Sequence, residues 1–225
     1  MINNPRHIPA TKKEINSKTS ETTEKFREIM KYLLGYTNLK PTKKVENFVG
    51  QFFEKFFEKL FSGSIVDINW HIPDIEVKIW GKKILFEIKT SNNWNWINLK
   101  LNQLKRFVKH ENCMYIFVFY KCDKPAFTYQ QLWYEWFLEK IAFDSIYVIP
   151  PFFLSEFESQ NEQLKRRQKL TFMDKPRDET VIKVSRSRLE EFCLNNNIEL
   201  QIKGKIRYYW IKEKYIKPLL DIELP

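Results

Sequence analysis

Three charged residues near the middle of the chain have the types and the spacing of a hydrolytic metal site. Asp74 is followed thirteen residues later by Glu87-Ile88-Lys89, so two carboxylates and an amine lie within one short stretch. Carboxylate oxygens are the ligands that Mg²⁺ and Mn²⁺ prefer, and a nearby ammonium group offsets the negative charge that develops when a phosphodiester is hydrolysed. We therefore expect a divalent-cation site, provided that the fold brings these side chains together.

The stretch that carries these residues is predicted to be a β-hairpin. Two runs of alternating apolar and polar residues, Asp74–Trp80 and Lys83–Lys89, flank Gly81-Lys82. A glycine-containing pair between two such runs is a turn signal. Because successive side chains of a strand point to opposite faces, the apolar residues of both runs share one buried face and the acids and lysines share the other.

A turn at Gly81-Lys82 also predicts which residues face each other. Glu76 should face Glu87, and Asp74 should face Lys89 at the end of the hairpin that lies away from the turn. Two opposed carboxylates repel each other, which favours a cation between them. Glu76 is therefore a further candidate carboxylate, whereas Lys78 should lie nearer the turn and away from the metal.

The pattern of Asp74 followed by Glu87-Ile88-Lys89 resembles the motif of the PD-(D/E)XK nuclease superfamily, which includes type II restriction endonucleases and archaeal Holliday-junction resolvases. The resemblance implies that Asp74, Glu87 and the backbone carbonyl of Ile88 bind Mg²⁺, with Mn²⁺ as a possible substitute. It also implies that Lys89 orients or activates the attacking water. The implied fold is a restriction-endonuclease-like core with the element order αβββαβ.

Two further site residues are expected on helices. Apolar residues recur at three-four spacing over positions 45–61, which predicts an amphipathic helix that packs on the sheet. Gly50 and Glu54 of this helix resemble the Gly-x-x-x-Glu of the resolvase branch, so Glu54 is the expected supporting acid and Glu46 is the alternative. Gln103 lies on the helix predicted after the hairpin, where members of the superfamily often carry a glutamine near the metal.

The other elements of the first part of the chain follow from periodicity and turn residues. Helices are predicted over positions 26–34, 45–61, 101–108 and 128–141; strands over 64–70, 114–120 and 145–149; and a polar loop over 90–95. From position 45 onward the order is helix, strand, hairpin, helix, strand, helix, strand. This order predicts an α/β fold with a central mixed β-sheet flanked by helices.

The segment after Pro151 is predicted to be an α+β extension. It should hold a helix that is capped by Ser155 and runs into a basic segment, a strand over 181–184, a helix capped by Ser187, and a hairpin of 198–202 with 205–211. The basic segment supplies candidate phosphate contacts, and three later arginines are candidate base contacts. The DNA-binding candidates are Lys165, Arg166, Arg167, Lys169, Arg186, Arg188 and Arg207.

Three regions are expected along the chain. Residues 1–21 are predicted to be a basic flexible arm, residues 22–150 the nuclease core with its N-terminal helices, and residues 151–225 an extension for DNA recognition or dimerisation that packs on the core. The three cysteines fit no paired metal-ligand spacing, so neither a disulfide nor a zinc site is expected.

Composition limits the classes of function. The 225 residues carry a formal net charge of +10, and 43% of them are hydrophobic, which allows one sizeable domain with an anionic partner. No apolar run approaches the roughly 18 residues of a membrane span, and the N-terminus lacks the apolar core of a signal peptide. We expect a cytoplasmic protein that is not bound to a membrane and needs no small-molecule cofactor.

The function predicted from these features is a Mg²⁺-dependent, sequence-specific endonuclease for double-stranded DNA, similar to type II restriction enzymes and homodimeric like its twofold target. A Holliday-junction resolvase is the alternative within the same superfamily. A basic DNA-binding protein without catalytic activity is the alternative of a different class.

Overall fold

The computed structural model describes residues 45–62, 64–65, 73–79, 81–92, 96–123, 136–137, 140–172, 175–209, 211–222 and 224. The helices and strands are α2 (Val45–Leu60), β1 (Ser64–Ile65), β2 (Ile75–Ile79), β3 (Lys82–Asn92), β4 (Trp96–Lys100), α3 (Leu101–Phe107), β5 (Cys113–Lys121), β6 (Ala142–Ile149), α5 (Pro151–Gln160), β7 (Lys165–Phe172), β8 (Lys175–Ser185), α6 (Arg186–Asn195), β9 (Leu200–Lys203), β10 (Ile206–Tyr209) and α7 (Lys217–Leu220). Two short 3₁₀ helices, η1 (Glu162–Leu164) and η2 (Glu213–Tyr215), connect some of them.

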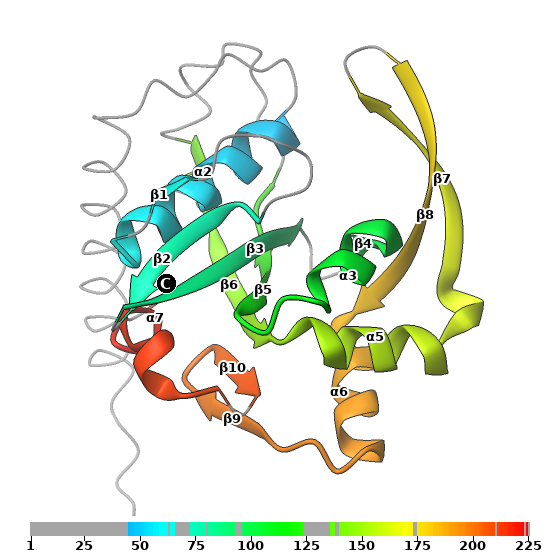
Figure 1. Cartoon of the computed structure of the whole chain (residues 1–225). Coiled ribbons are helices and arrows are strands. Elements are labelled where there is room, and N and C mark those ends of the chain that lie inside the picture. The colour runs from blue at the N-terminus through cyan, green and yellow to red at the C-terminus, as the bar shows by residue number, and fades with distance from the viewer. Residues whose placement is uncertain are drawn as a thin grey trace, which may run out of the picture.

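The largest unit is a seven-stranded sheet with the strand order β1-β2-β3-β5-β6-β10-β9. β2 and β3 form an antiparallel hairpin, β5 runs parallel to β3, and β6 runs antiparallel to β5. β10 joins parallel to β6, so a strand from the later part of the chain extends the sheet that the hairpin begins (Figure 1). The prediction of an α/β fold with a central mixed sheet flanked by helices is confirmed.

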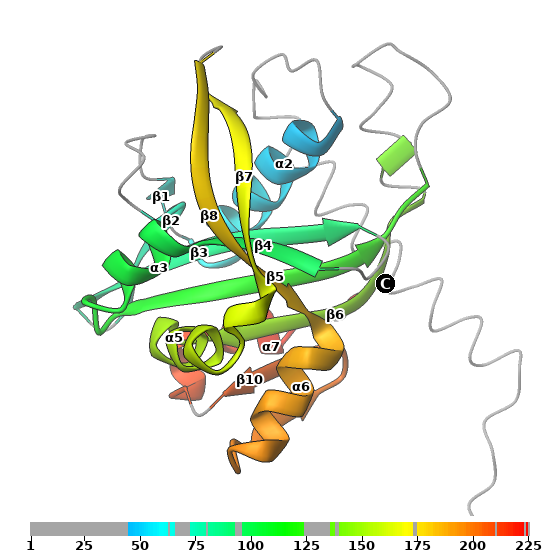
Figure 2. The same cartoon turned by 90° about the vertical axis from the view of Figure 1, so that its right-hand side faces the viewer.

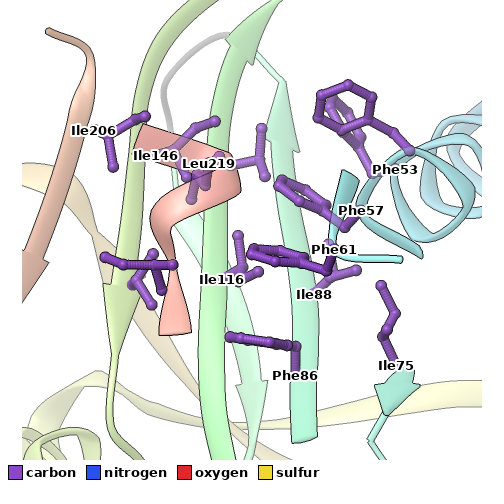
Figure 3. Close-up of a cluster of buried hydrophobic side chains, with 14 of the residues drawn as sticks. Phe53, Phe57, Phe61, Ile75, Phe86, Ile88, Ile116, Ile146, Ile206 and Leu219 are labelled. Atoms are coloured by element: carbon purple, nitrogen blue, oxygen red, sulfur yellow. The ribbon is translucent and has the colours of Figure 1, made fainter. Parts of the chain in front are cut away.

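Helix α2 covers one face of this sheet. Its apolar residues recur every three or four positions, which places them on one side of the helix. Five of those with described side chains are at most 2% exposed: Val49, Phe52, Phe53, Phe56 and Phe57. Leu60, at the end of the helix, is partly buried. Figure 3 shows phenylalanines from this region directed toward strand side chains such as Ile88 and Ile116, and Phe61 stacks on Phe86 with ring centroids 4.7 Å apart. This packing fixes α2 across β2 and β3.

The opposite face of the sheet is covered by α3, α5 and α6. β5 is buried on both sides, as its continuous apolar sequence predicts. Its even-numbered residues, such as Ile116 and Val118, pack in the hydrophobic cluster of α2. Its odd-numbered residues, such as Tyr115 and Phe117, pack in the cluster of α3, α5 and α6. β5 therefore links the two hydrophobic clusters of the molecule.

A second sheet has three strands in the order β4-β8-β7. Its inner face, which includes Ile97 and Ile182, packs in the cluster of α3, α5 and α6. β4 pairs with Val181–Ser185 of β8, whereas β7 pairs with β8 from Lys175 to Ile182. β7 and β8 therefore continue as a two-stranded ribbon beyond the part of β8 that pairs with β4. Figures 1 and 2 both show this ribbon rising from the body toward the top of the view.

The turn of the β2–β3 hairpin differs from the predicted one. Ile79 pairs with Lys82, so the two turn residues are at positions 80 and 81 rather than at 81 and 82. Gly81 has φ +73°, a conformation that glycine adopts without steric cost and that two-residue hairpin turns require. The glycine is thus the second residue of the turn, and every cross-strand pairing shifts by two residues.

This shift changes partners but not faces. Because the side-chain period of a strand is two, a shift of two residues leaves each side chain on the face predicted for it. Glu76 faces Leu85 and not Glu87, so the predicted pairing of these two acids is wrong. One step beyond the last pair of the ladder, Asp74 comes level with Glu87 and not with Lys89.

Two further differences lie immediately after the site motif. Thr90–Asn92, predicted as a loop, is the end of β3 and pairs with Val118–Tyr120 of β5. Pairing with a buried neighbouring strand thus outweighs the weak strand preference of Ser and Asn. β4 has no counterpart in the prediction. It depends on pairing with β8, which is far away in the sequence.

The basic segment does not lie on a helix. Helix α5 begins at Pro151, which suits the first helical position because proline has no N–H to leave unpaired there, and it ends at Gln160. Lys165–Lys169 belong instead to β7, at the edge of the second sheet. Charged residues are common on edge strands because they oppose edge-to-edge aggregation. The predicted helical continuation of this segment is wrong.

The later elements agree more closely with the prediction. Helix α6 begins two residues early, because Ser185 and not Ser187 is its N-cap and accepts a hydrogen bond from the backbone N–H of Arg188. The predicted hairpin is formed by β9 and β10, with Gly204 in the turn at φ +59°. Several predicted elements lie outside the described residues: the arm over 1–21, the helix over 26–34, most of the helix over 128–141, and the strand after Ile65.

Candidate active site

Asp74 lies immediately before β2, beside Glu87 and Ile88 of β3. The backbone N–H of Ile88 donates a hydrogen bond to Asp74 Oδ2 at 2.7 Å, which ties this carboxylate to the neighbouring strand. Glu87 is 1% exposed. Alternation along β3 buries Phe86 and Ile88 in the cluster of α2 and therefore directs Glu87 to the opposite face. The two predicted carboxylates thus come together at the end of the hairpin away from the turn.

One oxygen of Glu87 has two partners and the other has none. Lys89, two residues further along the same face of β3, forms an ion pair with Glu87 Oε1. Gln103 Nε2 reaches from α3 and donates a hydrogen bond to the same oxygen at 2.6 Å. Glu87 Oε2 is buried and has no hydrogen-bond partner among the residues that the structure describes. Lys89 and Gln103 therefore hold the carboxylate by one oxygen only.

Glu54 completes the group from the side of α2. Its side chain is partly exposed, whereas those of its helix neighbours Phe53 and Phe57 are fully buried. Burial raises the pKa of Glu54 to about 7, and the charges of Asp74 and Glu87 add to the rise while Lys89 opposes it. Glu54 is therefore electrostatically coupled to the other three side chains. We call Glu54, Asp74, Glu87 and Lys89 the acid cluster. The side chain of the alternative residue, Glu46, lies outside the described part.

The acid cluster holds more negative than positive charge in a largely buried place. Burial raises the pKa of Glu87 to about 7, against the influence of Lys89 and with support from Asp74. Burial also raises the pKa of Asp74, although Lys89 and the Ile88 N–H favour its charged form. Burial alone would lower the pKa of Lys89, but Glu87 and Asp74 outweigh burial and raise it. The ammonium group of Lys89 thus interacts with three carboxyl groups, those of Glu54, Asp74 and Glu87.

The donor atoms of this cluster fit a hard divalent cation. Asp74 and Glu87 supply carboxylate oxygens, and Glu87 Oε2 is a buried oxygen without a partner in the described residues. Oxygen ligands suit Mg²⁺ and Mn²⁺, and a bound cation would offset the excess negative charge. Within the described ranges no three His, Cys, Asp or Glu side chains are grouped closely enough to form a complete metal site by themselves. The carbonyl of Ile88 is the third ligand that the sequence motif implies.

Glu76 and Lys78 lie away from the cluster. Glu76 forms an ion pair with Lys83 at 2.5 Å, on the side of the hairpin nearer the turn. Lys78 faces Lys83 across the hairpin and is exposed. The expectation that Glu76 lies across from Glu87 as a further carboxylate of the site is therefore wrong. Lys78 lies nearer the turn and away from Glu87, as expected.

The predicted phosphate contacts lie on β7. Lys165 is held by two carboxylates, at 2.6 Å from Glu158 and 2.9 Å from Glu162. Arg166 and Arg167 are exposed, and neither forms an ion pair with a described carboxylate. Lys169 follows on the same strand. Arg166 and Arg167 are thus more accessible to a partner than Lys165.

The three candidate base contacts do not form one surface. Arg186 pairs with Asp144 at 2.5 Å, and Arg207 Nε lies 3.7 Å from Glu190 Oε1. We call Asp144, Arg186, Glu190 and Arg207 the arginine cluster. Tyr147 donates a hydrogen bond to Glu190 at its edge. Arg188 lies outside this cluster and is exposed on α6.

Sequence reasoning did not identify Tyr115 as part of the site. Tyr115 is the residue of β5 that pairs with Glu87, and it is fully buried with no hydrogen-bond partner for its hydroxyl in the described region. Burial and the adjacent Glu87 carboxylate raise the pKa of Tyr115 far above its usual value. The one signal in the sequence is a tyrosine within a buried strand, because a buried tyrosine hydroxyl usually has a partner.

The sequence matches no protein-family model and no curated protein. Among the residues that the structure describes, no helix has both the length and the apolar character needed to cross a bilayer.

Proposed function

We propose that this protein is a Mg²⁺- or Mn²⁺-dependent endonuclease with a restriction-endonuclease-like core, and that its substrate is double-stranded DNA. The observation that supports the proposal most is the convergence of the residues predicted from the motif. Lys89 of β3 and Gln103 of α3 both contact the buried carboxylate of Glu87. Asp74, just before β2, accepts a hydrogen bond from the adjacent Ile88 N–H, and Glu54 of α2 interacts with these groups through its charge.

The acidic residues are assigned to cation binding. Asp74, Glu87 and the Ile88 carbonyl would hold the cation. When bound, such a cation polarises a phosphate oxygen and lowers the pKa of the attacking water. The raised pKa values of the carboxyl groups indicate how strongly this site favours added positive charge.

Lys89 and Glu54 are assigned to charge and proton control. The raised pKa of Lys89 keeps its amine protonated at neutral pH, so Lys89 Nζ donates hydrogen bonds and offsets negative charge on the phosphate. This favours an orienting role for Lys89 over a role as a base. Glu54, with a pKa of about 7, can accept a proton at its carboxylate near neutral pH. Gln103 restrains Glu87 through its hydrogen bond.

Sequence-specific cleavage by a homodimer remains the favoured form of this activity, and junction resolution remains the alternative. The second sheet and helix α6 add structure beyond the αβββαβ order, and the exposed Arg166 and Arg167 lie on that added part. Added elements of this kind suit a protein that reads base sequence in a groove, since a two-stranded ribbon fits the major groove.

The test is cleavage of supercoiled plasmid DNA by the purified protein with Mg²⁺, compared with the same reaction in excess chelator. Discrete fragments from a plasmid of known sequence are the expected result. Cutting of synthetic four-way junctions without discrete plasmid fragments would favour a resolvase. DNA binding with no cleavage in Mg²⁺ or in Mn²⁺ would contradict the nuclease proposal and would favour a DNA-binding protein without catalytic activity.

A further inference from the structure

Three buried polar atoms around Glu87 have no hydrogen-bond partner among the described residues. They are Glu87 Oε2, the side-chain oxygen of Gln103 and the hydroxyl of Tyr115. Within that part of the chain, no other buried side-chain nitrogen or oxygen shares this property. Buried polar groups in native proteins are almost always paired, so three unpaired atoms on neighbouring side chains indicate a bound ligand.

The three side chains converge from three elements. Glu87 and Tyr115 are paired residues on the adjacent parallel strands β3 and β5, so their side chains leave the same face of the sheet about 4.8 Å apart. Gln103 is bonded to Glu87 from α3. Phe107, one turn further along that helix, packs on the ring of Tyr115 with centroids 5.7 Å apart. The tyrosine ring therefore lies beneath the helix that carries Gln103.

The hydrogen-bonding capacities of these atoms match one water molecule. The amide nitrogen of Gln103 faces a carboxylate, so its oxygen is left as an acceptor. Glu87 Oε2 is a second acceptor, and the hydroxyl of Tyr115 is a donor. A water donates two hydrogen bonds and accepts at least one, and buried waters typically make about three hydrogen bonds to groups that would otherwise be unpaired.

We propose that Tyr115 is a positioning residue, which together with Gln103 holds an ordered water against Glu87 Oε2 and thereby fixes the orientation of the Glu87 carboxylate. Lys89 and Gln103 contact only Oε1, so a contact at Oε2 would fix the second oxygen of the carboxylate as well. The role of this orientation in cation binding rests on the proposed function. The presence of the water does not rest on the proposed function, because the fold defines its three partners.

The experiment compares Tyr115→Phe with a matched control, Tyr147→Phe. Both tyrosines are buried on central strands, but Tyr147 donates its hydrogen bond to Glu190 in the arginine cluster. A high-resolution crystal structure of the wild type should contain the water, and the Tyr115→Phe structure should lack it or show it displaced. Calorimetric titration with Mn²⁺ should show about tenfold weaker binding for Tyr115→Phe, as is typical when a group that orients a metal ligand is removed. Tyr147→Phe should bind Mn²⁺ like the wild type even if it melts at a lower temperature.

A double-mutant cycle sharpens the test. Gln103→Leu removes both the direct bond to Glu87 and one partner of the water, so Tyr115→Phe should weaken Mn²⁺ binding much less in that background than in the wild type. Fully additive effects, no water between the three groups, or unchanged Mn²⁺ affinity of Tyr115→Phe would each overturn the role of Tyr115. If the wild type binds Mn²⁺ and cuts DNA, such a result leaves the proposed nuclease intact. A wild type that neither binds Mn²⁺ nor cuts DNA overturns the nuclease as well.

Discussion

The molecule contains two clusters of charged side chains that differ in charge balance. The arginine cluster sets two guanidinium groups against two carboxylates, with Arg186 on Asp144 at 2.5 Å and Arg207 near Glu190 at 3.7 Å. The acid cluster sets one ammonium group against three carboxyl groups. Burial raises the pKa of Glu54 and Glu87 to about 7 in the acid cluster. In the arginine cluster the bond to Asp144 raises the pKa of Arg186, although burial opposes the rise.

The difference supports a structural role for the arginine cluster and fits the cation site proposed for the acid cluster. Balanced ion pairs leave little net charge for a ligand to neutralise, so they can hold α6 on β6 and β10 without further partners. An unbalanced buried cluster costs folding free energy that a bound cation returns. Charge balance within a cluster is thus a better guide to function than the number of charged residues in it.

The largest expected effect comes from neutralising an acid of the acid cluster. Asp74→Asn or Glu87→Gln should slow DNA cleavage on the order of a thousandfold or more, because each removes a charged cation ligand and leaves the basic surface unchanged. DNA binding in chelator should stay within about twofold of the wild type, since neither residue lies among the phosphate contacts. Single-turnover cleavage and a binding titration measure the two effects.

Neutralising one acid in each cluster should change stability in opposite directions. Without a divalent cation, Asp74→Asn should raise the free energy of unfolding by about 1 kcal/mol, because it lowers the excess charge of the acid cluster. Asp144→Asn should lower it by about 1 kcal/mol, because it weakens a balanced pair. Loss of stability in both variants, measured by urea unfolding in chelator, would mean that the two clusters do not differ in the way described.

The next effect separates Lys89 from Lys78, a second lysine of the hairpin. Lys89→Ala should slow single-turnover cleavage roughly 10²- to 10³-fold at saturating Mg²⁺, because it removes the ammonium group of the acid cluster. Lys78→Ala is the matched control: Lys78 is exposed and faces Lys83, so its loss should leave the rate nearly unchanged. Equal loss of activity in both variants would contradict the assignment of Lys89.

The acid cluster should also give stability a particular pH dependence. The folded pKa of Glu54 and of Glu87 is about 7, above the reference value of 4.5, so the folded state binds protons more tightly than the unfolded state. Stability of the cation-free protein should therefore fall as pH rises from about 5 to 8, by roughly 2 kcal/mol for each of the two groups. Urea unfolding at several pH values measures this slope. Glu54→Gln should reduce this slope without removing it, because Glu87 also contributes, and Mn²⁺ should restore stability at pH 8. A slope of the opposite sign would contradict the raised pKa values.

The smallest expected effect extends the comparison to exposed arginine side chains. Replacing Arg166 and Arg167 by Ala should weaken binding to all DNA sequences and reduce the log–log salt slope by about 0.9 for each phosphate that the variant no longer binds. Arg186 is the control, because its guanidinium is already held by Asp144 and its removal should act on stability first. A salt slope that does not change in the double variant would mean that these two arginines do not bind phosphates.

Much of the candidate site could be predicted because it depends on local periodicity. The face of each hairpin residue was predicted correctly although the register was off by two, since the strand period is also two. Glu54 and Gln103 followed from helix periodicity combined with the motif. Glu76 was assigned wrongly because its partner depends on the turn, and the turn depends on whether Gly81 is its first or its second residue.

The parts that could not be predicted depend on pairing between distant segments. β4 and the basic strand β7 form one sheet only through β8, and the amino-acid sequence of β7 shows no alternation that marks it as a strand. Tyr115 becomes a site residue only when β5 lies parallel to β3 in the observed register. Polar residues in such segments carry no local signal of their partners.

The position of β10 has a consequence for how the protein folds during synthesis. β10 lies inside the main sheet, between β6 and β9, and pairs parallel to β6 through Ile206 and Ile146. The ribosome releases β6 well before β10. One edge of β6, a very apolar strand, therefore stays unpaired until β10 is made. Long-range parallel pairing forms slowly, and unpaired strand edges recruit other chains. The nascent protein should therefore depend on chaperones that shield β6 until Leu200–Tyr209 has emerged.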